Sequence, residues 1–255
     1  MTTDRTNGSL YTKIENGIAH IEFGHPASNS FVSELLDRLC AEIEALAVHP
    51  EVAALVLRSE GERAFCAGAS FDELVAISTL EEGQKFFSGF ANVINAMRRC
   101  PKPILGRVQG KTVGGGVGLV AACDYAYATV DAAIKLSEIS VGIGPFVIAP
   151  AVERKMGKAA LGALSLYPTE WKNAYWAQEN GLYQKVFDSI SEMDKELEIH
   201  LEKLGGYNPA ALSQMKQVLW QGTEHWDQLL KDRAAMSCQL ALSEATKKAL
   251  AKFKK

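Results

Sequence analysis

The feature that most constrains this chain is the glycine-rich segment GKTVGGGVGLVAACD at residues 110–124. It follows the apolar, strand-like segment PILGRV at residues 103–108 and leads into small helix-forming residues. Three consecutive glycines, Gly114 to Gly116, leave bare backbone N–H groups where the helix begins, and the helix dipole favours negative charge there. The segment alone is also compatible with a tight turn or with close strand–helix packing. It therefore predicts a strand–turn–helix unit whose amides can hold a carbonyl oxygen that becomes negative during a reaction.

Two further segments share the pattern of a strand followed by small residues. Residues 64–74, AFCAGASFDEL, follow a strand-like stretch at 53–58 and let a ligand approach the backbone closely. Residues 135–145, KLSEISVGIGP, place Glu138 in an apolar neighbourhood bounded by glycines. Taken alone, Glu138 fits a helix-capping or salt-bridged glutamate better. Two loops with backbone donors and one acid together suit enolate chemistry on a thioester.

These three segments, in their order and spacing, resemble the crotonase family, also called the enoyl-CoA hydratase/isomerase family. The match runs from about residue 10 to about residue 165, and the helical tail is also similar to that of the family. The resemblance implies an α/β fold, with a spiral core of ββα turns at residues 1–200. It implies a C-terminal helical region at 201–255, for oligomerisation or as a lid, and assembly into homotrimers or hexamers. The expected ligand is an acyl-CoA thioester, and no separate cofactor is expected because coenzyme A is part of the substrate.

The resemblance also assigns roles to individual residues of this chain. The backbone N–H groups of Ala69 and Gly115 form the oxyanion hole for the thioester oxygen, and Glu138 is the acid or base. Coenzyme A runs along the backbone of Ala27 and Ala67. The further substrate-binding residues expected in the two loops and the acyl pocket are Gly68, Gly114, Gly118 and Phe71, although Phe71 fits core packing equally well.

The chain departs from the family at Gly118. Hydratases of the family generally carry two glutamates, one at this position and one at the position of Glu138, whereas isomerases that move a double bond from the 3 to the 2 position often keep only the second. A dienoyl isomerase would carry acids at Gly118 and near Phe146, and neither is present. Gly118 is expected to leave space beside the acyl group for a water, a branch or a second carboxylate. A branched or dicarboxylic substrate such as methylglutaconyl-CoA, an intermediate of leucine breakdown, is therefore plausible.

The first prediction is accordingly an enoyl-CoA hydratase that adds water across the 2,3 double bond with Glu138. The second is a Δ3,Δ2-enoyl-CoA isomerase that uses the same residues. A crotonase-type decarboxylase and a non-catalytic acyl-CoA-binding subunit stay open. The apolar neighbours of Glu138 (Leu136, Ile139 and Val141) are expected to raise the pKa of its carboxyl if it is buried.

Composition excludes several other classes. A net charge of −3 gives no excess of basic residues for nucleic acid or an anionic membrane. Five scattered cysteines without CxxC spacing indicate neither a zinc site nor a disulfide framework. The first five residues lack the apolar core of a signal peptide, and no run of about 18 apolar residues exists. A cytoplasmic location is the expectation.

Periodicity predicts the main elements. Asn16-Gly17 predicts a hairpin over residues 10–23, and the apolar spacing of residues 35–46 predicts an amphipathic helix. The remaining predicted strands are 53–58, 103–108, 124–128 and 183–187, and the remaining predicted helices are 82–99, 148–156, 158–166, 170–179, 189–204, 209–220 and 224–252.

Overall fold

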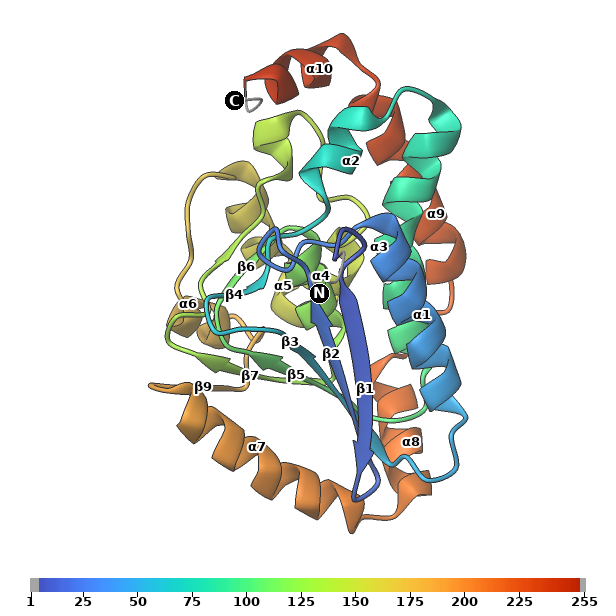
Figure 1. Cartoon of the computed structure of the whole chain (residues 1–255), viewed down its shortest axis with the longest axis vertical. Coiled ribbons are helices and arrows are strands. Elements are labelled where there is room, and N and C mark those ends of the chain that lie inside the picture. The colour runs from blue at the N-terminus through green and yellow to red at the C-terminus, as the bar shows by residue number, and fades with distance from the viewer. Residues whose placement is uncertain (1–4, 253–255) are drawn as a thin grey trace.

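The computed structural model describes residues 5–252, and two parallel-rich sheets organise its core. The larger sheet has six strands in the order β1-β2-β3-β5-β7-β9, which extend from β1 near the centre of Figure 1 to β9 at the left. Only the β1–β2 pair is antiparallel, and the predicted turn joins it with positive φ at Asn16 and Gly17. The bounds of its strands are β1 Ser9–Glu15, β2 Ile18–Gly24, β3 Ala54–Ser59, β5 Ile104–Val108, β7 Tyr125–Thr129 and β9 Lys185–Phe187.

A second sheet has three short strands, and the loops that follow these strands lie in the three segments singled out in the sequence. Its strands β4 (Ala64–Cys66), β6 (Lys111–Val113) and β8 (Ile134–Lys135) run parallel. Each follows a strand of the larger sheet in sequence, and each is followed by a helix. The α/β class is thus confirmed, with a strand–strand–helix unit that recurs around a spiral. The helices that follow are α2 Phe71–Ala76 with α3 Leu80–Arg99, then α4 Gly115–Ala122, and then the 3-10 helix η1 Glu138–Val141.

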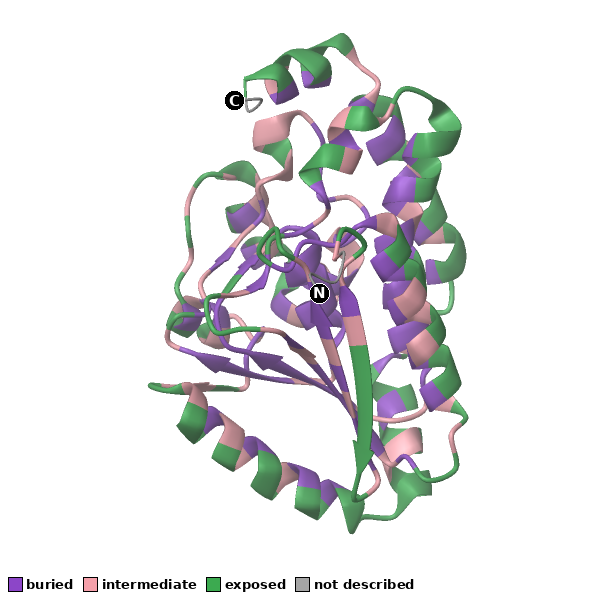
Figure 2. Ribbon diagram, in the orientation of Figure 1, coloured by how far each residue is buried: buried purple, intermediate pink, exposed green. Residues whose placement is uncertain are grey.

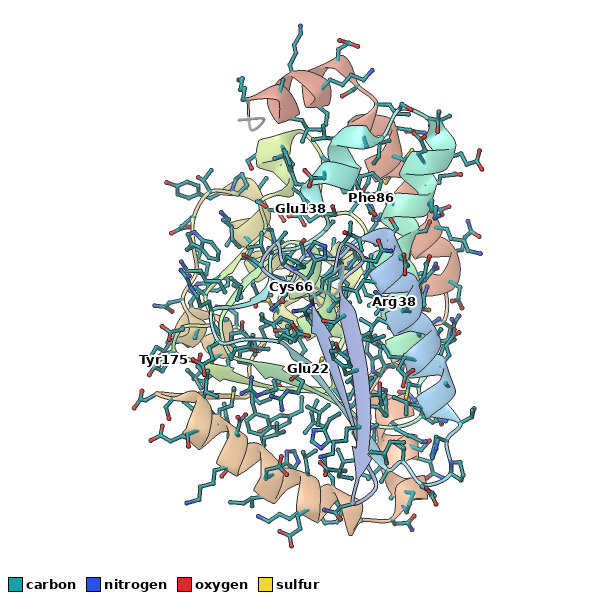
Figure 3. All side chains as sticks on the ribbon, in the orientation of Figure 1. Glu22, Arg38, Cys66, Phe86, Glu138 and Tyr175 are labelled. Atoms are coloured by element: carbon teal, nitrogen blue, oxygen red, sulfur yellow. The ribbon has the colours of Figure 1, made fainter. Side chains whose placement is uncertain are left out.

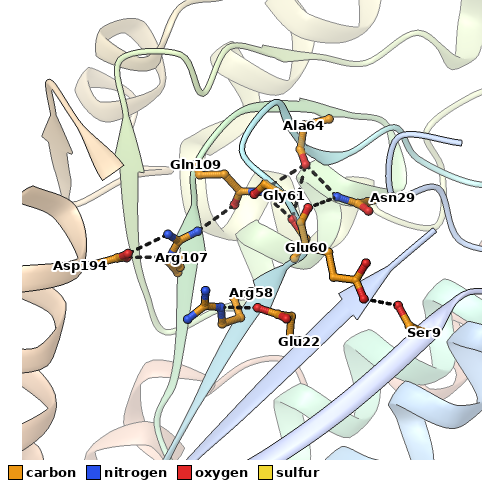
Figure 4. Close-up of polar contacts among 11 residues, drawn as sticks. Ser9, Glu22, Asn29, Arg58, Glu60, Gly61, Ala64, Arg107, Gln109 and Asp194 are labelled. Atoms are coloured by element: carbon orange, nitrogen blue, oxygen red, sulfur yellow. Dashed lines mark hydrogen bonds and ion pairs between the residues drawn. The ribbon is translucent and has the colours of Figure 1, made fainter. Parts of the chain in front are cut away.

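Helices cover both faces of the larger sheet. Helix α1 (Ser33–Ala47) buries its predicted apolar stripe on one side, where α3 and α4 also pack. Helix α7 (Ile190–Gly205) covers the other side with Met193 and Leu197, and Asp194 accepts a 2.6 Å hydrogen bond from the buried Arg107 (Figure 4).

Position 200, the predicted end of the spiral core, falls inside α7. The division into core and C-terminal region stays a prediction.

The C-terminal segment differs from the prediction in one respect. The expected single helix at 224–252 is wrong, because α9 (Trp226–Ala241) ends with Leu242 as its C-cap and α10 (Glu244–Ala251) begins after Ser243. The Ser243 hydroxyl caps α10 by accepting from the amide of Thr246. Helix α8 is Pro209–Leu219, and α9 runs along α3 with a 2.9 Å ion pair between Arg98 and Asp227.

The middle of the chain contains two further helices. Helix α5 (Ala149–Leu166) bends at Gly157, where the two predicted helices meet. Helix α6 is only Ala174–Glu179 rather than 170–179, because Lys172 pairs with Ile134 as an isolated bridge and Asn173 caps the helix. None of the helices described between residues 5 and 252 combines the length and the apolar character needed to cross a membrane.

Candidate active site

The glycine-rich loop lies so close to the side chains of Glu138 and Phe90 that Gly114 and Gly115 leave no room for a side chain of their own. Gly114 adopts φ +52°, and a Cβ there would stand 2.8 Å from Oε1 of Glu138. Gly115 begins α4, and a Cβ on it would stand 2.3 Å from the ring of Phe90. The first glycine thus makes room for the carboxylate and the second for an aromatic wall.

The second loop converges on the same place. Phe31 donates its amide to the Gly68 carbonyl at 2.8 Å and accepts from the amide of Ser70 at 2.7 Å. Because these two residues flank Ala69, the N–H of Ala69 points away from Phe31. A Cβ on Gly68 would lie 3.8 Å from the amide nitrogen of Gly115, so the two loops are in contact.

Two unpartnered amides result from this arrangement. Within residues 5–252, the N–H groups of Ala69 and Gly115 donate to no other group of the chain. Both residues line one cavity of about 190 Å³. The amide of Gly115 also lies at the start of α4, where the helix dipole adds to its attraction for negative charge. The structure therefore brings together the two donors that the resemblance assigns to an oxyanion hole.

Glu138 lines the same cavity from the first residue of η1. Its residue surface is partly exposed, but Oε2 is buried and has no hydrogen-bond partner among the described residues. Burial of the carboxyl raises its pKa to about 7, as the sequence led us to expect. Such a group is present in both protonation states near neutral pH, which suits an acid–base catalyst. Figure 3 shows Glu138 and Phe86 above the strands, and both line this cavity.

The rest of the cavity is mainly apolar. Phe71 is part of its wall, and so are two residues that the sequence analysis did not place there, Leu74 and Ser237. Glu138 is the only ionisable side chain in the lining, among the residues that the structure describes. Besides the alanines, the other apolar side chains of the wall are Phe86, Phe87, Phe90, Val113, Val141, Ile143, Pro145, Val147 and Ile148.

The expectation of open space beside Gly118 is wrong. A Cβ on Gly118 would stand 2.4 Å from Cγ2 of Ile148, so that side chain already fills the position. Gly118 is absent from the cavity lining, whereas Ile148 is part of it. Ile148 therefore covers Gly118 on the side of the cavity, and a role of Gly118 in substrate binding stays a prediction.

The loop predicted to meet coenzyme A lies next to the cavity. Ala67 and Gly68 line the cavity, and the amide of Ala67 donates to the Ser28 carbonyl at 3.1 Å. Ala27 is outside the lining, and its amide donates to Nδ1 of His25 at 3.1 Å. Contact of Ala27 and Ala67 with coenzyme A stays a prediction.

Asn29 ties the loop that contains Ala27 to the segment that precedes Ala67. Its side-chain amide donates to the carbonyls of Glu60 and Ala64 at 2.8 and 2.9 Å (Figure 4). The loop around Ala27 and the loop around Ala67, which we expect to contact coenzyme A, are therefore tied to each other by hydrogen bonds.

The neighbouring thiol is not a second catalytic group. Cys66 is fully buried, and burial raises its pKa to about 12, so it is protonated at neutral pH. Within residues 5–252, no group of three or more His, Cys, Asp or Glu side chains could hold a metal ion.

Comparison with known proteins agrees with this geometry. A family model described as "Enoyl-CoA hydratase/isomerase" matches residues 13–254, nearly the whole chain. A solved structure of enoyl-CoA hydratase from Bacillus halodurans superposes with a TM-score of 0.88 over 95% of this chain and 99% of that one, at 20% sequence identity. The architecture is therefore the crotonase fold.

Curated relatives carry the names of more than one reaction. The peroxisomal Delta(3,5)-Delta(2,4)-dienoyl-CoA isomerase of Arabidopsis thaliana is 26% identical, covering 88% of this chain and 84% of its own. The short-chain-enoyl-CoA hydratase of Clostridium acetobutylicum is 28% identical, covering 82% and 80%. The human mitochondrial methylglutaconyl-CoA hydratase is 34% identical, but over only 46% of this chain and 34% of its own.

Proposed function

The chain belongs to the enoyl-CoA hydratase/isomerase family, and within it we propose that this protein is an enoyl-CoA hydratase that adds water across the 2,3 double bond. One observation carries the proposal. The buried, unpartnered Oε2 of Glu138 lies in a cavity that is also lined by two residues with unpartnered amides, Ala69 and Gly115.

The proposed mechanism uses the two amides to hold the thioester oxygen and Glu138 to move one proton. The thioester oxygen accepts hydrogen bonds from the amides of Ala69 and Gly115, which draws electrons from the conjugated double bond. The Glu138 carboxylate takes a proton from water while the water oxygen forms a bond to C3. The electron pair of the double bond moves toward the thioester oxygen as an enolate, which the two amides stabilise. Glu138 then returns the proton to C2, so the product has gained one water.

We favour hydration over the other reactions because the cavity offers a binding position for the attacking water. A buried polar atom without a partner is where an ordered water is expected, and such a water needs at least two polar partners. Oε2 of Glu138 is one candidate, and the neighbouring Ser137 also lines the cavity. Because Ile148 fills the space at Gly118, we place the attacking water against Glu138 rather than against Gly118.

The lining supports an apolar acyl group. None of the described residues of the cavity wall is cationic, and Ser237 is its only polar residue outside the pair Ser137 and Glu138. A distal carboxylate, as in methylglutaconyl-CoA, would lose its hydration there without an ionic partner. We therefore place a straight or branched hydrocarbon acyl-CoA first and keep methylglutaconyl-CoA as the alternative substrate to test. This chemistry uses only the thioester, one water and the chain's own groups, so we propose that no separate cofactor takes part.

Isomerisation is the second candidate, and the lone acid favours it. Glu138 could remove a proton from C2 of a 3-enoyl-CoA and return it at C4, and that reaction needs no water. The Arabidopsis relative is named as a dienoyl-CoA isomerase. The positions at which we expect acids in such an enzyme are Gly118 and the vicinity of Phe146, and they hold none.

The experiment that tests these alternatives is turnover of 2-enoyl-CoA, 3-enoyl-CoA and methylglutaconyl-CoA in heavy-oxygen water, read by mass. The variants are Glu138→Gln and, as a matched control, Glu22→Gln on β2, whose carboxylate pairs with Arg58 at 2.8 Å. Heavy oxygen in the product of the wild type and the control, lost in the Glu138 variant, is expected. Double-bond migration without heavy oxygen would establish the isomerase. Carbon dioxide release would indicate a decarboxylase, and tight binding without turnover a binding subunit.

A homo-oligomer and a cytoplasmic location also stay predictions. Exposed apolar side chains on α8 (Met215, Val218 and Leu219) support association with further copies. Mass measurement of the purified protein in solution is expected to give a trimer or a hexamer.

A further inference from the structure

The last helix, α10, makes a specific contact with the turn that carries the proposed catalytic acid. Its main neighbours in the fold are η1 and α9, and it lies at the upper end of the molecule in Figure 1. Figure 2 shows it mostly exposed. Only Thr246 and Leu250 are buried on it, one helical turn apart and therefore on one face. A threonine with no exposed surface on such a peripheral helix suggests a role beyond packing.

The Thr246 hydroxyl is the centre of a short hydrogen-bond chain. It accepts from the Ser243 hydroxyl at 3.2 Å and donates to the carbonyl of Gly142 at 2.7 Å. Gly142 has φ +88°, and a Cβ on it would stand 2.7 Å from that hydroxyl oxygen. Helix and turn are therefore so close that only glycine fits between them.

Gly142 in turn closes the 3-10 helix on which Glu138 sits. Its amide donates to the carbonyl of Ile139 at 3.1 Å, and the next amide, of Ile143, donates to the carbonyl of Glu138 at 3.1 Å. The backbone of Glu138 is thus one hydrogen-bonded turn away from the peptide that Thr246 holds. A shift of α10 would move that peptide, and with it the carboxylate that lies 2.8 Å from the Cβ position of Gly114.

We propose that Thr246 is a positioning residue, which holds the Glu138 turn in its reactive geometry and thereby makes the docking of α10 a condition of catalysis. The proposal rests on the function proposed above, because it takes Glu138 to be the acid–base group. Helix α10 then completes the active site from the C-terminal end of the chain, without itself touching the substrate.

Three threonine variants test this role. Thr246→Val keeps the shape and removes the hydroxyl, whereas Thr246→Ser keeps the hydroxyl. Thr223→Val is the matched control, because Thr223 is also buried in the C-terminal region and its hydroxyl donates to a backbone carbonyl, that of Trp220 at 2.6 Å, but neither residue lines the cavity. Thermal melting of all three verifies that they fold.

The expected result is a separation of kcat from KM. Thr246→Val is expected to lower kcat about tenfold, the factor that corresponds to one hydrogen bond, with KM unchanged. Thr246→Ser is expected to restore kcat to within about twofold of the wild type, and Thr223→Val to leave it unchanged. Equal kcat in the wild type and Thr246→Val would overturn the proposal.

Two readouts need no substrate, so they separate a failure of this proposal from a failure of the proposed function. Amide exchange at Gly142 and Ile143 is expected to be faster in Thr246→Val and unchanged in Thr223→Val. Carboxyl NMR, with Glu138→Gln to assign the signal, is expected to show a lower pKa of Glu138 in Thr246→Val, because water then reaches the carboxyl. If the wild type converts none of the substrates, these two readouts still test whether Thr246 holds the Glu138 turn in place. Unchanged exchange and an unchanged titration would overturn the positioning role.

Discussion

The folding stability of the wild type is expected to fall between pH 4.5 and about pH 7 because of Glu138, and Glu138→Gln is expected to remove that dependence on pH. Burial raises the pKa of Glu138 from its ordinary 4.5 to about 7. Between those two values, the folded protein keeps a proton on Glu138 that the unfolded chain has released. The wild type therefore has the full benefit of the neutral carboxyl below pH 4.5 and loses it as pH rises to about 7. Glutamine stays neutral at every pH, so the variant does not lose this stability as pH rises.

The size of the effect follows from the shift in pKa. Each pKa unit corresponds to about 1.4 kcal/mol, so the shift corresponds to about 3 kcal/mol in the free energy of unfolding. Glu138→Gln is expected to gain that amount relative to the wild type between pH 4.5 and pH 8. The assay is urea unfolding of both proteins at pH 4.5, 6, 7 and 8, with equal protein concentrations, since association would also alter stability.

A second glutamate provides a control of opposite sign. The amides of Ser78 and Thr79 and the Ser78 hydroxyl donate to Glu82 and lower the pKa of its carboxyl. That stabilisation is present above the unfolded pKa and is lost as pH falls. Glu82→Gln is therefore expected to be less stable than the wild type at neutral pH and to approach it in acid. If the stability difference between Glu138→Gln and the wild type were the same at every pH, burial of an ionisable Glu138 would be refuted.

Three further substitutions or reagents test other parts of the structure. Gly114→Ala would place a side chain in a left-handed conformation and 2.8 Å from Oε1 of Glu138, so turnover is expected to fall about 100-fold while the melting temperature also falls. Lys216→Met would leave Asp124 buried without the ammonium that lies 2.9 Å from it, and urea unfolding is expected to show a loss of about 3–5 kcal/mol. Because burial raises the pKa of Cys66 to about 12, its thiol is expected to resist a disulfide reagent at pH 8 in the folded protein and to react once unfolded.

The larger sheet and its covering helices were predictable because their apolar patterns are long. The stripe from Leu35 to Leu46 repeats the helical period several times, and β3 begins with a continuous apolar run of buried residues. The smaller sheet was not predicted, because β4, β6 and β8 have only two or three residues each and lie within glycine-rich segments. The break before α10 was missed for a related reason. Ser243 interrupts no apolar period, and its capping bond to Thr246 is visible only in three dimensions.

The site was predictable as far as it is built from contiguous loops. The bare amides and Glu138 lie in three short segments whose residue types show what each can do. The parts contributed by tertiary contact were not predictable. Ser237 and Thr246 reach the cavity wall and the Glu138 turn from α9 and α10, about a hundred residues farther along the chain. Nothing in the local sequence of either residue indicates that contact.

Gly118 shows why a missing side chain does not imply an empty space. The residue that occupies the position, Ile148, comes thirty positions later, and protein interiors are packed too densely to leave such a volume unfilled. In this chain the bare position at Gly118 and the isoleucine side chain therefore fit each other. A glutamate introduced at Gly118 alone would meet Cγ2 of Ile148 at 2.4 Å and could not reach the cavity. A two-acid site would require Ile148 to be shortened as well, so the proposed chemistry has Glu138 as its one acid–base group.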